Sequence, residues 1–133
     1  MSTASVVIIG SYRKHFPAIA TAAQAFRASG MDVLSPGEGR PINPGAAFVF
    51  LDSDEIADPK LIADTVLTCI DRADAVYLCN PGGYVGQSAT FELGYATARG
   101  RRCFAAEIPV DEFLRLYVNQ VATPGEVAAM LAT

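Results

Sequence analysis

The stretch AVYLCNPGGYVGQSATFELGYATARG, residues 75 to 100, predicts a strand, a glycine-rich loop and a helix in succession. The opening AVYLC is a short apolar run rich in β-forming residues, which is typical of a buried strand. Residues 80–83 (NPGG) end that strand. From Ser88 the apolar residues recur at helical spacing, and Gly100 is placed to end the helix. In an open α/β sheet, a loop after a strand lies where ligands bind.

Glu92 is the candidate catalytic residue of this stretch. It lies four residues after Ser88 and three before Tyr95, so the three side chains are expected on one flank of the helix. With Ser88 as the N-cap, Glu92 is close to the positive end of the helix dipole, which favours the ionised carboxylate. An ionised carboxylate beside exposed backbone N–H groups suits a nucleophile better than a general acid. A solvated helix glutamate is the ordinary alternative.

Residues 80–88 (NPGGYVGQS) and 92–96 (ELGYA) resemble the signature of the nucleoside 2-deoxyribosyltransferase family. That family includes related deoxynucleoside monophosphate N-glycosidases. The first strand with Gly10 and Ser11, and the segment 34–36, are also similar to its first half, so the resemblance covers most of the chain. It implies that Glu92 attacks the anomeric carbon of the sugar of a nucleoside or nucleoside monophosphate. The glycosyl-enzyme ester then passes the sugar to water or to a second base.

The sequence departs from the family in the helix that is expected over residues 59–72. Relatives carry an aspartate or histidine there that helps to orient the sugar and the nucleophile, and that position falls on Val66. Asp64 is close in sequence but points to another side of the helix. Asp52, in the acidic run 52–55, is expected at the ligand side of the sheet, or else in a solvated loop. Asp52 and Asp64 are therefore the candidates for a second carboxylate.

Hydrophobic patterning predicts a doubly wound, five-stranded parallel sheet of flavodoxin-like order in one domain spanning residues 1–133. The strands are expected at residues 5–9, 32–34, 47–51, 75–79 and 102–107. Helices are expected at residues 17–29, 59–72, 88–100, 111–118 and 124–132. The proline- and glycine-rich segment 36–45 is expected to be a long exposed loop, and such loops are often lids.

The first loop combines positive charge with a helix N-terminus. Arg13, Lys14 and His15 follow the first strand, and this combination favours an anion such as a 5′-phosphate. A solvated basic turn is the alternative. A dinucleotide site would need three glycines here, so NAD is not expected.

The substrate-binding candidates, taken from this loop and from the glycine-rich loop, are Gly10, Ser11, Tyr12, Arg13, Asn80, Gly82, Gly83, Tyr84, Gly86 and Ser88. The glycines let the backbone approach the sugar, and Tyr12 or Tyr84 is available to stack on the base.

Composition narrows the function classes. The 133 residues are 51% hydrophobic and 18% charged, with a net charge of −4, which argues against nucleic-acid binding. No apolar run is long enough to span a membrane, and residues 1–4 show no signal-peptide pattern. The three cysteines lack CxxC spacing and fit small buried side chains in a reducing cytoplasm. We therefore expect a cytoplasmic protein without a metal or cofactor.

Several alternatives stay open at this point. A cytokinin-activating type of phosphoribohydrolase is less favoured, because its glutamate follows the last loop glycine by four residues and Glu92 follows Gly86 by six. A nucleotide-binding sensor without catalysis and a flavin module are the others. The base, the choice of ribose or deoxyribose, the need for a phosphate and the acceptor are also open.

The apolar segment 111–119 (DEFLRLYVN) and the family resemblance predict a homodimer or higher oligomer, with ordinary packing of this segment as the alternative.

Overall fold

The computed structural model describes residues 3–132 and contains a five-stranded parallel sheet. Met1 and Ser2, on which part of the signal-peptide expectation rests, and Thr133 lie outside the described residues. The strands are β1 (Ser5–Gly10), β2 (Asp32–Ser35), β3 (Ala75–Cys79), β4 (Arg102–Ala105) and β5 (Gln120–Val121), in the order β2-β1-β3-β4-β5. This arrangement confirms the predicted doubly wound sheet and its flavodoxin-like order.

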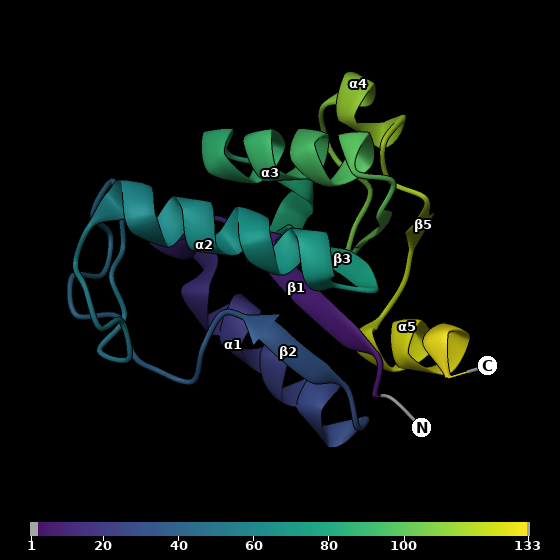
Figure 1. Cartoon of the computed structure of the whole chain (residues 1–133). Helices are drawn as coiled ribbons and strands as arrows, with labels where there is room; N and C mark the ends of the chain where they lie inside the picture. Colours follow the sequence, from purple (N-terminus) through teal and green to yellow (C-terminus); the bar gives the residue numbers. More distant parts are fainter. Residues whose placement is uncertain (1–2, 133) are drawn as a thin grey trace.

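Helices cover both faces of the sheet (Figure 1). Helices α1 (Tyr12–Ala28) and α5 (Pro124–Leu131) pack on one face, and α2 (Pro59–Arg72) and α3 (Gln87–Ala98) pack on the other. A short helix α4 (Glu112–Arg115) and a 3-10 turn η1 (Pro81–Gly83) complete the described elements. The central strands β1 and β3 pair directly and are buried along their whole length, as expected for strands covered on both sides.

Local signals in the sequence explain most helix boundaries. The Asp58 side chain accepts hydrogen bonds from the N–H groups of Lys60 and Leu61, and Pro59 occupies the first helical position of α2. Thr123 and Glu126 form a capping box at the start of α5. Helix α1 begins earlier than predicted, because Ser11 caps it and Pro17 is accommodated after a kink at His15.

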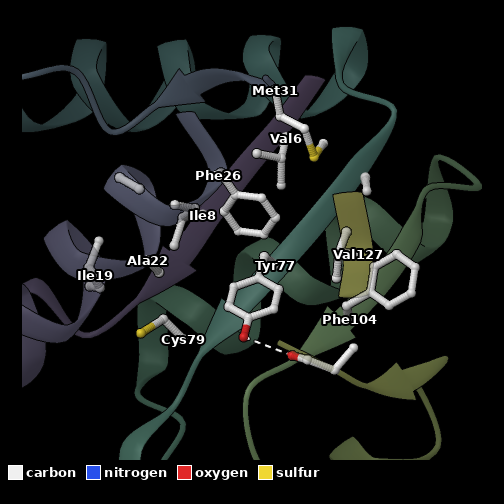
Figure 2. Close-up of a cluster of buried hydrophobic side chains, with 13 residues drawn as sticks. Val6, Ile8, Ile19, Ala22, Phe26, Met31, Tyr77, Cys79, Phe104 and Val127 are labelled. Carbon is white, nitrogen blue, oxygen red and sulfur yellow. Dashed lines mark hydrogen bonds between the residues drawn. The ribbon is translucent and has the colours of Figure 1, made fainter. Parts of the chain in front are cut away.

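The hydrophobic core is divided by the sheet into two clusters. On the α1 and α5 side, Phe26 and Tyr77 pack edge to face with their ring centroids 5.0 Å apart (Figure 2). The hydroxyl of Tyr77 donates a hydrogen bond of 2.8 Å to the carbonyl of Ala122, drawn as the dashed line. On the other side, α2 and α3 bury Ile70 and Leu93 against the sheet. Each such side chain contributes roughly 1.5–3 kcal/mol of hydrophobic stabilisation.

One predicted strand is wrong. Residues 47–51 lie in the long segment between β2 and α2, where the only ladder-type pairing is an antiparallel bridge between Pro41 and Leu51. The N–H of Ile42 donates to the carbonyl of Phe50 at 3.0 Å, so this apolar run pairs with its own loop. It cannot enter the middle of the sheet, because β1 and β3 are already bonded to each other. The fifth strand is instead β5, which was not predicted. It consists of two exposed residues and pairs with β4 at the edge of the sheet.

Among residues 3–132, no helix is both long and apolar enough to cross a lipid bilayer.

Candidate functional site

A cavity of about 600 Å³ opens at the carboxyl ends of β1 and β2. The chain leaves β1 into α1 on one face of the sheet and leaves β3 toward α3 on the other face, so the cavity lies at the topological switch point. Its wall contains the predicted site residues Gly10, Ser11, Tyr12, Arg13, Tyr84, Gly86, Ser88 and Glu92. The structure thus brings the first loop and the start of α3 together at one cavity.

Glu92 lines the cavity from the second turn of α3. Its carboxylate has no hydrogen bond or ion pair within residues 3–132. Burial raises the pKa of Glu92 from 4.5 to about 7, because an ionised carboxylate loses hydration in this position. The expectation that the helix position favours the ionised form is corrected. Helix α3 starts at Gln87 with Gly86 as its N-cap, so Glu92 is farther from the helix end than expected, and desolvation outweighs the dipole.

Tyr12 lines the same cavity as Glu92. The side chain of Ser35 interacts with its hydroxyl, and its ring packs edge to face on Phe16 with centroids 5.6 Å apart. Burial, with the charges of Glu92 and Asp54, raises the pKa of Tyr12 above its usual range. Ser35 was not predicted as a site residue, although its place at the carboxyl end of β2 is a usable signal. The Tyr12 hydroxyl therefore belongs to the same polar cluster as the carboxylate of Glu92.

Two helix N-termini face the cavity. Ser11 caps α1, and its hydroxyl accepts a hydrogen bond of 3.2 Å from the N–H of Lys14. The N-cap of α3 is Gly86, which supplies no side-chain cap, so the first N–H groups of α3 remain open to a ligand. Arg13 and Ser88 stand beside these two helix ends in the cavity wall. Backbone N–H groups, hydroxyls and a guanidinium are the groups that bind phosphate in proteins.

Lys14 and His15 contact a tyrosine instead of the cavity. The Lys14 ammonium lies 4.0 Å from the centroid of the Tyr84 ring, and the His15 ring packs edge to face on it at 5.9 Å. Neither residue lines the cavity, whereas Tyr84 does. Of the three basic residues that were predicted to bind a phosphate, Arg13 therefore lines the cavity. Lys14 and His15 instead pack against the ring of Tyr84.

The turn after β3 packs against the segment after β4. Asn80 is fully buried, and its side chain exchanges hydrogen bonds of 2.8 and 3.0 Å with the backbone of Glu107. The N–H of Gly82 donates to the Glu107 carboxylate at 2.9 Å. A Cβ on Gly83 would lie 2.6 Å from the carbonyl oxygen of Ile108. Asn80, Gly82 and Gly83, which were predicted to bind substrate, thus face the segment after β4, and none of them lines the cavity.

The two acids predicted as a second carboxylate also lie elsewhere. Asp64 is exposed and forms an ion pair with Lys60, with 2.6 Å between oxygen and nitrogen. Asp52 accepts a hydrogen bond of 3.0 Å from the N–H of Arg40 and borders a separate groove of about 630 Å³ between α1 and residues 36–40. Asp54 is the acid of this run that lines the cavity with Glu92.

The remaining wall is apolar. The first half of α2 and the loop before it line it with Ile62, Ala63, Val66, Phe48, Val49 and Leu51. Val66, the position that the family resemblance singled out, therefore lines the cavity, and it brings no polar group. Among residues 3–132, no cluster of three or more His, Cys, Asp and Glu side chains is arranged to hold a metal ion. The site thus combines a polar end, a buried carboxylate and an apolar side.

Solved structures share this fold. The CMP N-glycosidase BcmB of Clostridium botulinum superposes with a TM-score of 0.56 at 13% identity, over 96% of this chain and 98% of the other. A conserved protein of Enterococcus faecalis V583 superposes with a TM-score of 0.64 at 14% identity, over 98% of each chain. No protein-family model matches the sequence, and no curated protein matches it. At such low identity the likeness shows the fold alone.

Proposed function

We propose that this protein cleaves the N-glycosidic bond of nucleosides or nucleoside 5′-monophosphates, with Glu92 as the nucleophile. The observation that carries the proposal is the carboxylate of Glu92, which is largely buried, has no partner and lines a cavity at two helix N-termini. The fold shared with a CMP N-glycosidase supports this class of substrate. Membership of the nucleoside 2-deoxyribosyltransferase family, in a single domain over residues 1–133, is part of the same proposal.

The chemistry follows from the position of Glu92. Cleavage of a glycosidic bond passes through an oxocarbenium-like state, which a nearby carboxylate stabilises and then captures as an ester. An oxygen of Glu92 attacks C1′, the bond from C1′ to the base nitrogen breaks, and the electron pair leaves with the base. Water then releases the free sugar, or a second base takes the sugar and forms a new nucleoside.

The two ends of the cavity suit the two ends of a nucleotide. The N-termini of α1 and α3, with Ser11, Arg13 and Ser88, offer hydrogen-bond donors to a 5′-phosphate. The apolar side, formed by α2 and residues 48–51, suits the planar base. With the phosphate at one end and the base at the other, the sugar lies beside Glu92.

The decisive experiment is to incubate the protein with a panel of nucleosides and monophosphates and to measure free base. We expect base release from at least one member. Glu92→Gln keeps the size of the side chain and removes its charge, so turnover is expected to fall by several orders of magnitude while the fold is retained. Glu112→Gln, at an exposed position on α4, is the matched control and is expected to keep full activity. Turnover of Glu92→Gln within about threefold of the parent would exclude Glu92 as the nucleophile.

A non-catalytic nucleotide sensor is the second candidate. It is favoured by Val66, which brings an apolar side chain to the wall where relatives of the resembling family carry a polar one. A sensor binds a nucleotide and releases it unchanged, so calorimetric binding without any free base after long incubation identifies it. Base release that depends on Glu92 excludes the sensor.

A further inference from the structure

Asp54 supplies a second carboxylate to the cavity. Of the described residues that line the cavity, only Glu92 and Asp54 are acids. Asp54 lies between the apolar run of the loop and α2, and it is half-buried. The part of α2 that faces the cavity brings Ile62, Ala63 and Val66, none of which can move a proton. Asp54 is therefore the one carboxylate besides Glu92 that the described cavity wall offers.

The side chain of Asp54 is held with one oxygen fixed and the other available. Its Oδ2 accepts a hydrogen bond of 2.8 Å from the N–H of Leu51, and its own N–H donates to the Leu51 carbonyl at 3.0 Å. These two bonds form a closed turn that orients the carboxylate. Oδ1 has no hydrogen-bond partner within residues 3–132. A fixed carboxylate with one free oxygen is the geometry that a proton acceptor requires.

Asp54 lines the same cavity as the reacting carboxylate. The charges of Glu92 and Asp54 both raise the pKa of the Tyr12 hydroxyl, which also lines this cavity. Once Glu92 is esterified to the sugar, it can no longer act as a base. The second half of the reaction therefore needs another proton acceptor, and Asp54 is the carboxylate that the cavity wall offers.

We infer, on the basis of the proposed function, that Asp54 is the general base that releases the sugar from Glu92. The oxygen of a water molecule attacks C1′, and its proton passes to Oδ1 of Asp54. The bond between C1′ and the Glu92 oxygen breaks, and the electron pair returns to Glu92 as a carboxylate. Asp54 then gives the proton to solvent, and both carboxylates are restored.

The test uses Asp54→Asn in the full chain. Asparagine keeps an oxygen that accepts from the N–H of Leu51, so the turn is retained, but it cannot take a proton from water. The first half-reaction still runs, so we expect a burst of one base molecule per active site. Slow turnover follows, reduced on the order of 10²- to 10⁴-fold. Mass spectrometry then detects the glycosyl ester on Glu92 in the variant.

Azide separates a general base from a structural residue. Azide has no proton to lose, so it attacks the ester without a base, and the anion enters more easily where Asp54 has lost its charge. We expect azide to raise the turnover of Asp54→Asn severalfold and to give a glycosyl azide, with no such gain in the parent. Asp52→Asn, outside the cavity, is the control and is expected to behave as the parent.

The outcomes separate this inference from the proposed function. If the parent releases no base, the proposed function fails. If the parent releases base and Asp54→Asn turns over at the parental rate, or shows neither a burst nor azide rescue, Asp54 is not the base, although Glu92 remains the nucleophile. Asp54→Ser, whose hydroxyl also accepts from the N–H of Leu51, serves as a second variant if Asp54→Asn does not fold.

Discussion

At the scale of single residues, the state of Glu92 controls both activity and stability. A nucleophilic carboxylate must be ionised, yet burial raises the pKa of Glu92 to about 7. We therefore predict that kcat/KM, which reports the pKa of the free protein, rises with pH up to about 7, close to tenfold per pH unit well below that value, and levels off above it. A titration of kcat/KM with a nucleoside substrate checks this, because the phosphate of a monophosphate titrates near pH 6 by itself. A profile that is flat between pH 5 and 8 contradicts it.

The same burial makes the charge of Glu92 a cost to folding. The pKa is higher in the folded chain than its ordinary value of 4.5, so the folded state binds the proton more tightly than the unfolded state. The free energy of unfolding therefore contains a favourable contribution from the protonated Glu92 side chain. This contribution is fully present below pH 4.5 and is lost as pH rises through about 7. We predict that Glu92→Gln raises the melting temperature above pH 7 by several degrees and has little effect at pH 4.5. Thermal scans at pH 4.5, 6 and 8 measure the difference, and an equal shift at every pH contradicts the prediction.

Residue positions could be predicted from the sequence better than residue environments. Helical periodicity alone indicates that Ser88 and Glu92 share a flank, and both do line the cavity. The protonation of Glu92 could not be predicted, because it depends on the water that α2 and the loop before it exclude. Asp54 could not be told from Asp52 for a similar reason. The turn closed by Leu51 decides which carboxylate faces the site, and nothing in the acidic run indicates that turn.

At the scale of elements, the two helix N-termini set the ligand preference. Arg13 stands at the start of α1, close to the uncapped start of α3. We predict that Arg13→Gln weakens binding of a nucleoside monophosphate by roughly 1.5–3 kcal/mol, the scale of a charge-assisted hydrogen bond. Binding of the matching nucleoside is expected to stay nearly unchanged. Lys14→Gln is the control, because Lys14 contacts Tyr84 and does not line the cavity. An equal loss for both ligands in Arg13→Gln would assign Arg13 a structural role.

The turn η1 begins the glycine-rich loop, and its backbone conformation depends on two glycines. Gly82 and Gly83 both have positive φ, at 68° and 82°, so a side chain at either position strains the backbone by about 1–2 kcal/mol. Only Gly83 also lies against a neighbouring backbone, the carbonyl of Ile108. We predict that Gly83→Ala destabilises the fold clearly more than Gly82→Ala, in which nothing lies within 4 Å of the new Cβ. Denaturant unfolding of the two variants compares them directly, and equal losses would show that the contact with Ile108 is unimportant.

The loop between β2 and α2 shows why one strand was mispredicted. The run 47–51 is apolar because Phe48, Val49 and Leu51 line the cavity and because the segment folds back on residues 41–43. An apolar run of this length is equally compatible with a central strand, since hydrophobicity does not tell which surface covers the residues. Strand β5 is difficult to predict for the opposite reason. Its two residues, Gln120 and Val121, are exposed and too few to show a hydrophobic pattern, and the strand is defined by its pairing with the edge of β4.

At the scale of the whole molecule, one surface is unusually apolar. The segment after β4 exposes Ile108, Val110, Phe113, Leu116 and Tyr117, and Leu116 is 72% exposed. Only part of the predicted apolar segment 111–119 packs against the sheet, through Leu114 and the partly buried Val118. The beginning of the segment after β4 contacts the glycine-rich loop, because the N–H of Gly82 donates a hydrogen bond to the carboxylate of Glu107. A partner on this surface would therefore sit next to the turn that leads into the cavity.

We predict that this surface joins two copies of the chain in a symmetric homodimer. Contiguous apolar patches larger than a few hundred Å² are rare on monomers, and stable interfaces bury about 800 Å² per partner. Phe113 and Leu116 are large exposed side chains that contribute to such an area. Leu116→Asp places a charge in the centre of the patch, so we expect it to fold normally and to be monomeric. Ile42→Asp, at another exposed apolar position on the loop before α2, is expected to stay dimeric. Light scattering at micromolar concentration decides between them, and a parent protein that is fully active as a monomer would exclude the dimer as part of the working site.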